Sequence, residues 1–129
     1  MEVSSAKKET TQSASDIFSR ISDFNNFGKL LPPQISNWKS TTENCSFDIQ
    51  NMATLAMKFK EKTSFSKVVI ESEAPSPFKF ELQIEIQTIS ENLSETVVKL
   101  NADIPMMLSV MVKKPLQQFV DMLNEAITK

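Results

Sequence analysis

The chain has 129 residues, of which 40% are hydrophobic and 23% are charged, a composition typical of one soluble globular domain. It contains no His, no Tyr and a single Gly, which excludes a glycine-rich nucleotide loop, His-dependent catalysis and an imidazole metal site. Fourteen Lys and Arg stand against sixteen Asp and Glu, without a basic stretch, which disfavours nucleic acid as a partner. We therefore expect neither a metal nor another cofactor.

The N-terminal part is predicted to form one strand followed by two short helices. Residues 2–11 fit an edge strand. Ile17, Phe18, Ile21 and Phe24 recur at helical spacing after a run of N-capping residues, so residues 13–23 are predicted to form an amphipathic helix. A second helical stretch is expected over residues 26–31, before two prolines that cannot continue it. Residues 25–28 interrupt the first helical pattern, and Gly28 belongs to this interruption, where we expect a bend between the two short helices.

After the prolines the hydrophobic period changes from helical to alternating. Alternation of apolar and polar residues between short polar turns is typical of an antiparallel sheet with one face covered and one face solvated. The clearest case is the stretch from Phe78 to Thr88, where every second side chain is apolar. The predicted strands cover residues 35–41, 45–49, 53–60, 67–73, 78–88 and 96–102.

The C-terminal segment predicts one long helix that covers the sheet. Its apolar residues keep a single register across Pro115, which favours one kinked helix over two, and Pro105 is well placed near its start. The apolar positions are Leu108, Met111, Val112, Leu116, Phe119, Val120, Leu123 and Ile127. We expect no transmembrane segment and no secretion signal, because the sequence has no apolar run long enough to span a bilayer and no apolar stretch near its start. The expected location is therefore cytoplasmic.

Four segments of the chain carry a resemblance to a known superfamily. They are residues 22–33, the strand pair around Trp38 and Cys45, residues 76–80, and residues 115–120. With the order of elements, they make the sequence similar to small bacterial members of the START/SRPBCC superfamily, which includes relatives of the birch-pollen allergen and of polyketide cyclases. The resemblance implies an α+β helix-grip fold. A curved antiparallel sheet of about seven strands would wrap around the C-terminal helix, with two short helices after the first strand and residues 1–129 in one domain.

The resemblance also implies a cavity between sheet and helix that suits a small apolar ligand. The candidate lining residues are apolar positions of the strands and of the C-terminal helix, which could equally form a filled core. They are Phe47, Leu55, Met57, Phe59, Phe80, Leu82, Ile84, Leu108, Met111, Val112 and Phe119. Because the chain offers few reactive side chains, the sequence favours non-catalytic binding or carriage of a lipid-, sterol- or polyketide-like molecule.

Two other functions stay open. One is an enzyme resembling polyketide cyclases or hydratases, in which polar residues such as Asp48, Asp103 or Glu61 would face the cavity. The other is a protein-interaction module resembling activators of the Hsp90 chaperone. Cys45 is expected to be a small buried residue, because no His is present to activate a thiol. The sequence leaves the oligomeric state open.

Overall fold

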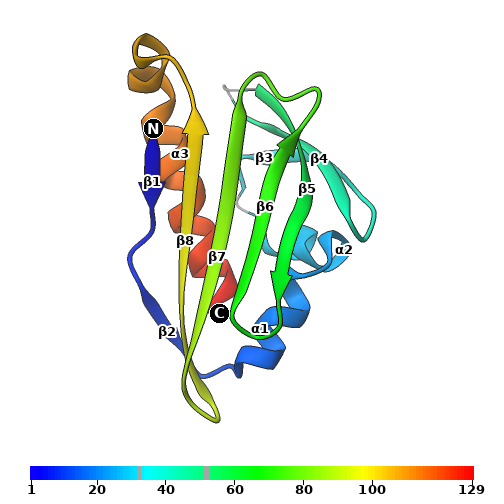
Figure 1. Ribbon diagram of the computed structural model, residues 1–129, viewed down its shortest axis with the longest axis vertical. Coiled ribbons are helices and arrows are strands. Elements are labelled where there is room, and N and C mark those ends of the chain that lie inside the picture. Colours follow the sequence, from blue (N-terminus) through cyan, green and yellow to red (C-terminus); the bar gives the residue numbers. More distant parts are fainter. Residues whose placement is uncertain (32, 51–52) are drawn as a thin grey trace.

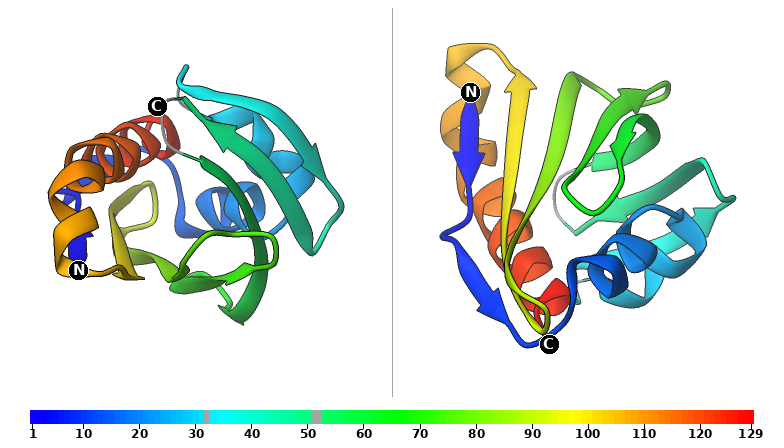
Figure 2. Two further views of the ribbon diagram at one scale, coloured as in Figure 1. Left: turned by 90° about the horizontal axis from the view of Figure 1, so that it is seen from above. Right: turned by 60° about the horizontal axis from the view of Figure 1, so that its bottom comes forward.

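The structure is a computed structural model that describes residues 1–31, 33–50 and 53–129. A curved antiparallel sheet lies against a long C-terminal helix, and two short helices close one end of the sheet (Figures 1 and 2). The elements are, in chain order, β1 (Glu2–Ser4), β2 (Lys8–Thr10), α1 (Ala14–Ile21), α2 (Phe24–Phe27), the 3-10 turn η1 (Gly28–Leu30), β3 (Ile35–Ser40), β4 (Asn44–Ile49), β5 (Ala53–Thr63), β6 (Lys67–Glu73), β7 (Lys79–Ser90), β8 (Leu93–Asp103) and α3 (Met106–Ile127).

Within the residues that the structure describes, the sheet has eight strands; seven follow the order β1-β8-β7-β6-β5-β4-β3, and β2 also pairs with β8. The edge strand predicted over residues 2–11 is divided into β1 and β2. The division falls at Ser5, whose backbone N–H donates to the Val98 carbonyl (2.8 Å) while its hydroxyl accepts from the Val98 N–H (2.9 Å). A side-chain oxygen therefore takes the place of a backbone acceptor, and the strand is interrupted there. The predicted α+β helix-grip architecture is otherwise confirmed.

Strand β7 shows how the sequence pattern builds the two faces of the sheet. Phe80, Leu82, Ile84 and Ile86 are buried, whereas the alternating positions are half-buried or exposed. The buried row faces the interior, where α3 packs along β8 and β1 (Figure 2). Helix α3 runs through Pro115 without interruption, as its apolar register predicted. Its buried apolar residues are Leu116, Phe119, Val120, Leu123 and Ile127.

Polar side chains begin the two short helices in the predicted region. The hydroxyl of Ser13 accepts from the Asp16 N–H (3.1 Å) at the start of α1, and an Asp23 carboxylate oxygen accepts from the Asn25 N–H (2.8 Å) before α2. Each cap satisfies a backbone donor that the helix cannot. Helix α1 then buries Ile17 among other apolar residues, and α2 buries both of its phenylalanines.

Gly28 is required for close packing rather than for a bend. Its φ of -58° and ψ of -19° are ordinary helical values that any residue adopts. A Cβ atom added to Gly28 would lie 2.5 Å from Nε1 of Trp38 and 2.9 Å from its Cδ1. A bend was therefore the wrong explanation for a glycine at position 28. The missing side chain instead allows the indole ring of Trp38 to contact the backbone.

The C-terminal end of α3 is held by a buried polar network. The Thr96 hydroxyl donates to the Asn124 side-chain oxygen (2.5 Å), and the Asn124 amide donates to the carbonyls of Ala6 (2.9 Å) and Thr96 (3.2 Å). Arg20 of α1 donates to the Ile127 carbonyl. These bonds fix the helix against β8 and α1. In the part of the chain that the structure describes, no helix combines the length and hydropathy needed to cross a bilayer.

Candidate functional site

The eleven candidate lining residues divide into a buried group and a less buried group. Seven of them lie in the hydrophobic core, two are partly buried at its border, and two are exposed. The seven are Phe47, Leu55, Met57, Phe80, Leu82, Ile84 and Phe119. Phe59 and Val112 are the partly buried pair, and Leu108 and Met111 are 51% and 74% exposed. The structure thus brings most of these residues together on the inner face of the sheet.

Aromatic rings fill the interior beside α2. Phe47 stacks on Trp38 with a centroid distance of 5.5 Å and on Phe119 at 6.3 Å, and Phe24 stacks on Phe59 at 4.0 Å. Sequence reasoning placed Phe24 on a helix but did not connect it to this cluster. Its helical spacing to Phe27 was the available signal, since residues three apart share a helix face. This part of the interior is occupied by the protein's own side chains.

The side of α3 that faces the sheet loses burial toward its N-terminal end. Leu116 is 1% exposed, Val112 one turn earlier is partly buried, and Leu108 a further turn earlier is half exposed. Phe78 and Ile104 at the same end of the sheet are also only partly buried. The inner apolar surface is therefore closed by packing beside α2 and left partly uncovered where α3 begins.

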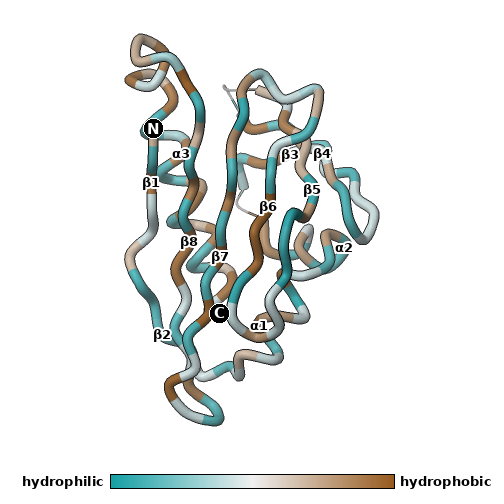
Figure 3. Tube along the Cα trace, in the orientation of Figure 1, coloured by the Kyte–Doolittle hydropathy of each residue, from teal (hydrophilic) through white to brown (hydrophobic). Residues whose placement is uncertain are grey.

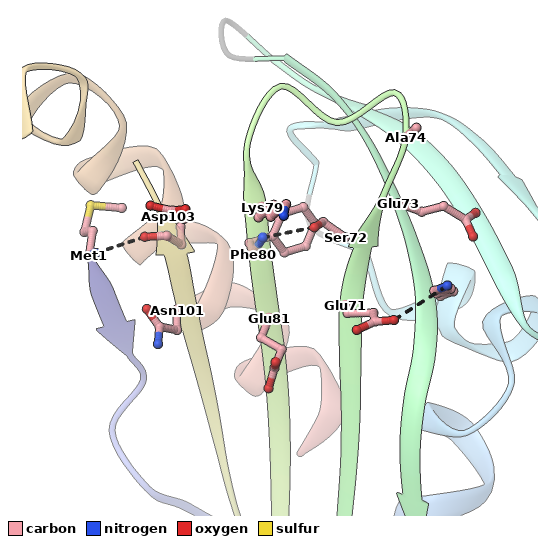
Figure 4. Close-up of a pocket in the computed structure, with 12 residues that line it drawn as sticks. Met1, Glu71, Ser72, Glu73, Ala74, Lys79, Phe80, Glu81, Asn101 and Asp103 are labelled. Carbon is pink, nitrogen blue, oxygen red and sulfur yellow. Dashed lines mark hydrogen bonds and ion pairs between the residues drawn. The ribbon is translucent and has the colours of Figure 1, made fainter. Parts of the chain in front are cut away.

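A pocket of about 820 Å3 lies on the outer, solvated face of the sheet near its upper edge, and its walls come from β5, β6, β7 and β8 (Figure 4). It is lined by Met1, Lys58, Glu71, Ser72, Glu73, Ala74, Lys79, Phe80, Glu81, Asn101, Ala102 and Asp103. Phe80 is the member of this lining that also belongs to the candidate set. The remaining walls are mostly polar and charged, so the pocket suits a hydrated polar group better than an apolar body.

Polar contacts order the walls of this pocket. Lys58 pairs with Glu71 across 3.6 Å, and the Met1 ammonium donates to the Ala102 carbonyl (2.9 Å). The backbone N–H of Phe80 donates to the Ser72 hydroxyl (3.0 Å). Figure 4 shows that these side chains come from neighbouring strands. The pocket is thus an ordered polar hollow on the outer face of the sheet, opposite the face that packs against α3.

The three residues considered for an enzyme lie on separate strands. Asp48 on β4 accepts from the Thr54 hydroxyl and from the Asn37 amide, each at 2.6 Å, and these bonds lower the pKa of its carboxyl. Glu61 on β5 pairs with Lys67 across 3.1 Å. Asp103 ends β8, three strands away from β5 in the sheet, and lines the polar pocket. The structure does not bring the three carboxylates together.

Cys45 is buried on β4, as the sequence indicated. Burial raises the pKa of its thiol to about 12, so the thiol is protonated at neutral pH and is a poor nucleophile. Within residues 1–31, 33–50 and 53–129, no three acidic, His or Cys side chains are grouped closely enough to hold a metal ion.

No protein-family model matches the chain, and no curated protein matches its sequence. Solved structures with the same architecture do match. A START superfamily protein from Mycobacterium smegmatis superposes with a TM-score of 0.77 at 19% identity, over 98% of this chain and 94% of that one. A protein from Thermus thermophilus gives 0.72 at 14% identity, over 99% and 94%. A point mutant of norcoclaurine synthase from Thalictrum, in complex with a transition-state analogue, gives 0.72 at 11% identity, over 98% and 93%. These likenesses, together with the sheet and helix described above, show that the chain has the START/SRPBCC helix-grip fold.

Proposed function

We propose that the chain, as one domain of residues 1–129, binds and carries a small apolar molecule between the inner face of the sheet and α3. The observation that carries the proposal is the loss of burial along the sheet-facing side of α3, from Leu116 to Leu108. Uncovered apolar surface next to a core is unfavourable in water, and a ligand placed there would cover it. A lipid-, sterol- or polyketide-like molecule has the required apolar body.

The proposed ligand contacts form two groups. Leu108 and Val112 would make the first contacts, because they lie where the inner surface is least covered, and Phe80 near the same end of β7 would come next. The remaining candidates would line the deeper part after small movements, for which the flexible side chain of Met57 is well suited. These deeper residues are Phe47, Leu55, Met57, Phe59, Leu82, Ile84 and Phe119, with Met111 at the entrance.

The first test uses protein purified from its own host under native conditions. We expect native mass spectrometry to find a bound lipid-like mass. We also expect fatty acids, sterols or polyketides to raise the melting temperature, since a ligand at a hundred times its Kd adds about 2.7 kcal/mol to the free energy of unfolding. Trp38 is the sole Trp in a chain without Tyr, and it stacks on Phe47. Its fluorescence therefore reports directly on the proposed site.

A matched pair of variants locates the ligand on α3. Leu108→Gln places a polar group on the sheet-facing side and is expected to weaken binding about tenfold, the effect of losing partial burial of one Leu side chain. Met107→Gln makes a comparable change one residue away, on a side chain that is 87% exposed, and is expected to leave affinity unchanged. Equal effects of the two variants, or no bound mass and no thermal shift with any ligand class, would refute the proposal.

A further inference from the structure

The first two turns of α3, residues 106–111, carry five apolar side chains that the rest of the protein leaves exposed. We name this segment the apolar tip. It lies at the upper end of the molecule next to the N-terminus (Figures 1 and 3). The exposed fractions are 85% for Met106, 87% for Met107, 51% for Leu108, 80% for Val110 and 74% for Met111. A contiguous apolar surface of this kind marks an interaction site.

The apolar tip is exposed around most of the helix circumference. Successive side chains of an α-helix point about 100° apart, so the consecutive residues Met106, Met107 and Leu108 already face three different directions. The side chain of Val110 points between those of Met106 and Met107, and the side chain of Met111 points between those of Met107 and Leu108. A protein groove or a second copy of the chain would cover one face of the helix and leave the others in water. A medium that surrounds the helix end would cover all of them at once, and a lipid layer is such a medium.

The charges along α3 fit the boundary of a lipid layer. Residues 104–112 contain no charged side chain, and Lys113 and Lys114 follow directly. At about 1.5 Å per residue, the lysines lie about 10 Å from the helix start, so insertion of the tip would bring them to the level of the headgroups. Long Lys side chains extend toward the headgroups while their stems stay in apolar surroundings. Two adjacent ammonium groups at this level are complementary to anionic lipid headgroups.

Acidic groups near the tip limit the electrostatic contribution. Asp103 comes just before the uncharged stretch, and Glu2 lies with Lys113 around a hollow of about 540 Å3 between β1 and α3. We therefore expect apolar insertion to provide most of the affinity and the two lysines to add a preference for anionic lipid.

We propose that the apolar tip inserts into the interfacial region of a lipid bilayer and docks the protein there, with Lys113 and Lys114 at the headgroups. This surface goes beyond the proposed function, because docking needs no carried ligand and rests mainly on Met106, Met107 and Val110, which are not among the proposed ligand contacts. The two proposals can therefore fail independently.

The test is sedimentation of the full chain with vesicles of phosphatidylcholine alone and of phosphatidylcholine mixed with phosphatidylglycerol. We expect the protein to sediment with both, and about tenfold more strongly with the anionic vesicles at low salt. The double variant Met107→Ser with Val110→Ser is expected to weaken binding at least about tenfold on both vesicle types. Both side chains are at least 80% exposed, so the fold and the proposed ligand contacts are unaffected. Lys113→Gln with Lys114→Gln is expected to abolish only the anionic preference.

Ile89→Ser is the matched control. Ile89 is also an exposed apolar residue (46%), and it lies in β7 beside the turn into β8. That hairpin is at the opposite end of the molecule from the apolar tip (Figure 1). This variant should sediment with vesicles as the unchanged protein does. Wild-type protein that stays in the supernatant, or equal losses in the tip variant and the Ile89 variant, would overturn the proposal. It would also be overturned by a dimer in solution that the tip variant converts to a monomer, since the tip would then be a contact between copies.

Discussion

The contact between Gly28 and Trp38 gives the sharpest test of the packing described above. We expect Gly28→Ala to destabilise the protein although its backbone angles suit alanine. The added Cβ would lie 2.5 Å from the indole nitrogen, closer than nonbonded atoms approach. The ring has little room to move, because it stacks on Phe27 (6.1 Å) and on Phe47 (5.5 Å). The clash must therefore be relieved by displacing packed aromatic groups.

Two opposing effects set the size of the change. Overpacking of a filled core costs about 1–3 kcal/mol. Alanine in place of glycine at a helical position gains about 0.5–1 kcal/mol, because the unfolded chain loses freedom. The net expectation is a loss of about 0.5–2 kcal/mol in the free energy of unfolding. For a chain of this length that corresponds to a decrease in Tm of about 2–10 °C.

A double-mutant cycle with Trp38→Leu isolates the clash. In the Trp38→Leu background the indole is absent, so Gly28→Ala should become neutral or stabilising by about 0.5–1 kcal/mol. Urea unfolding followed by far-UV circular dichroism measures all four proteins, including those that lack the only Trp. A Gly28→Ala protein as stable as the parent, or the same change in both backgrounds, would refute the packing argument.

Three further changes test other parts of the structure by urea unfolding. Asn124→Leu removes the hydrogen bonds to Thr96 and to the Ala6 carbonyl, and it should lower the free energy of unfolding by about 2–4 kcal/mol. If Thr96→Val lowered this free energy more than Asn124→Leu does, Asn124 would not be the centre of the network. Since burial raises the pKa of the Cys45 thiol from 9.0 to about 12, only the unfolded chain loses this proton between those values, and stability falls as pH rises. Between pH 8 and about pH 10.5, the free energy of unfolding of the parent should fall by about 1–2 kcal/mol more than that of Cys45→Ala. If the two proteins showed the same dependence on pH, the pKa of the thiol would not be raised by folding. Arg20→Met deletes the hydrogen bond to the last turn of α3 and should lower the free energy of unfolding by about 1 kcal/mol. An unchanged free energy of unfolding would show that this bond does not stabilise the fold.

The sequence predicted most of the fold because the buried positions repeat with a clear period. Strand β6 (Lys67–Glu73) has the predicted bounds, and β7 differs from its prediction by one or two residues at each end. A one-residue shift in register would move every apolar side chain of β7 to the solvated face, so the pattern leaves little freedom. The single helix through Pro115 follows from the same reasoning with a period of 3.6 residues.

The features that escaped prediction depend on contacts between distant parts of the chain. The break at Ser5 results from a hydroxyl that meets the Val98 backbone, and the need for Gly28 results from the approach of Trp38. Neither contact leaves a periodic signal. The same holds for the exposure of Leu108 and Met111, which share an apolar register with the buried part of α3 but lie where the sheet no longer covers the helix. The period of the apolar residues shows which side of the helix is apolar, but it does not show how far along the helix the sheet covers that side.

Strand β8 determines when this chain can complete its fold during synthesis. Val3 pairs with Leu100 and Thr10 with Ser94, so the first ten residues leave the ribosome long before their partner strand exists. Contacts between such distant residues are slow to form, and we expect folding in milliseconds to seconds rather than microseconds. Helix α3 follows β8 in the chain, so the inner face of the central strands stays uncovered until α3 has been synthesised. A nascent chain of this protein is therefore most prone to aggregate just before α3 emerges.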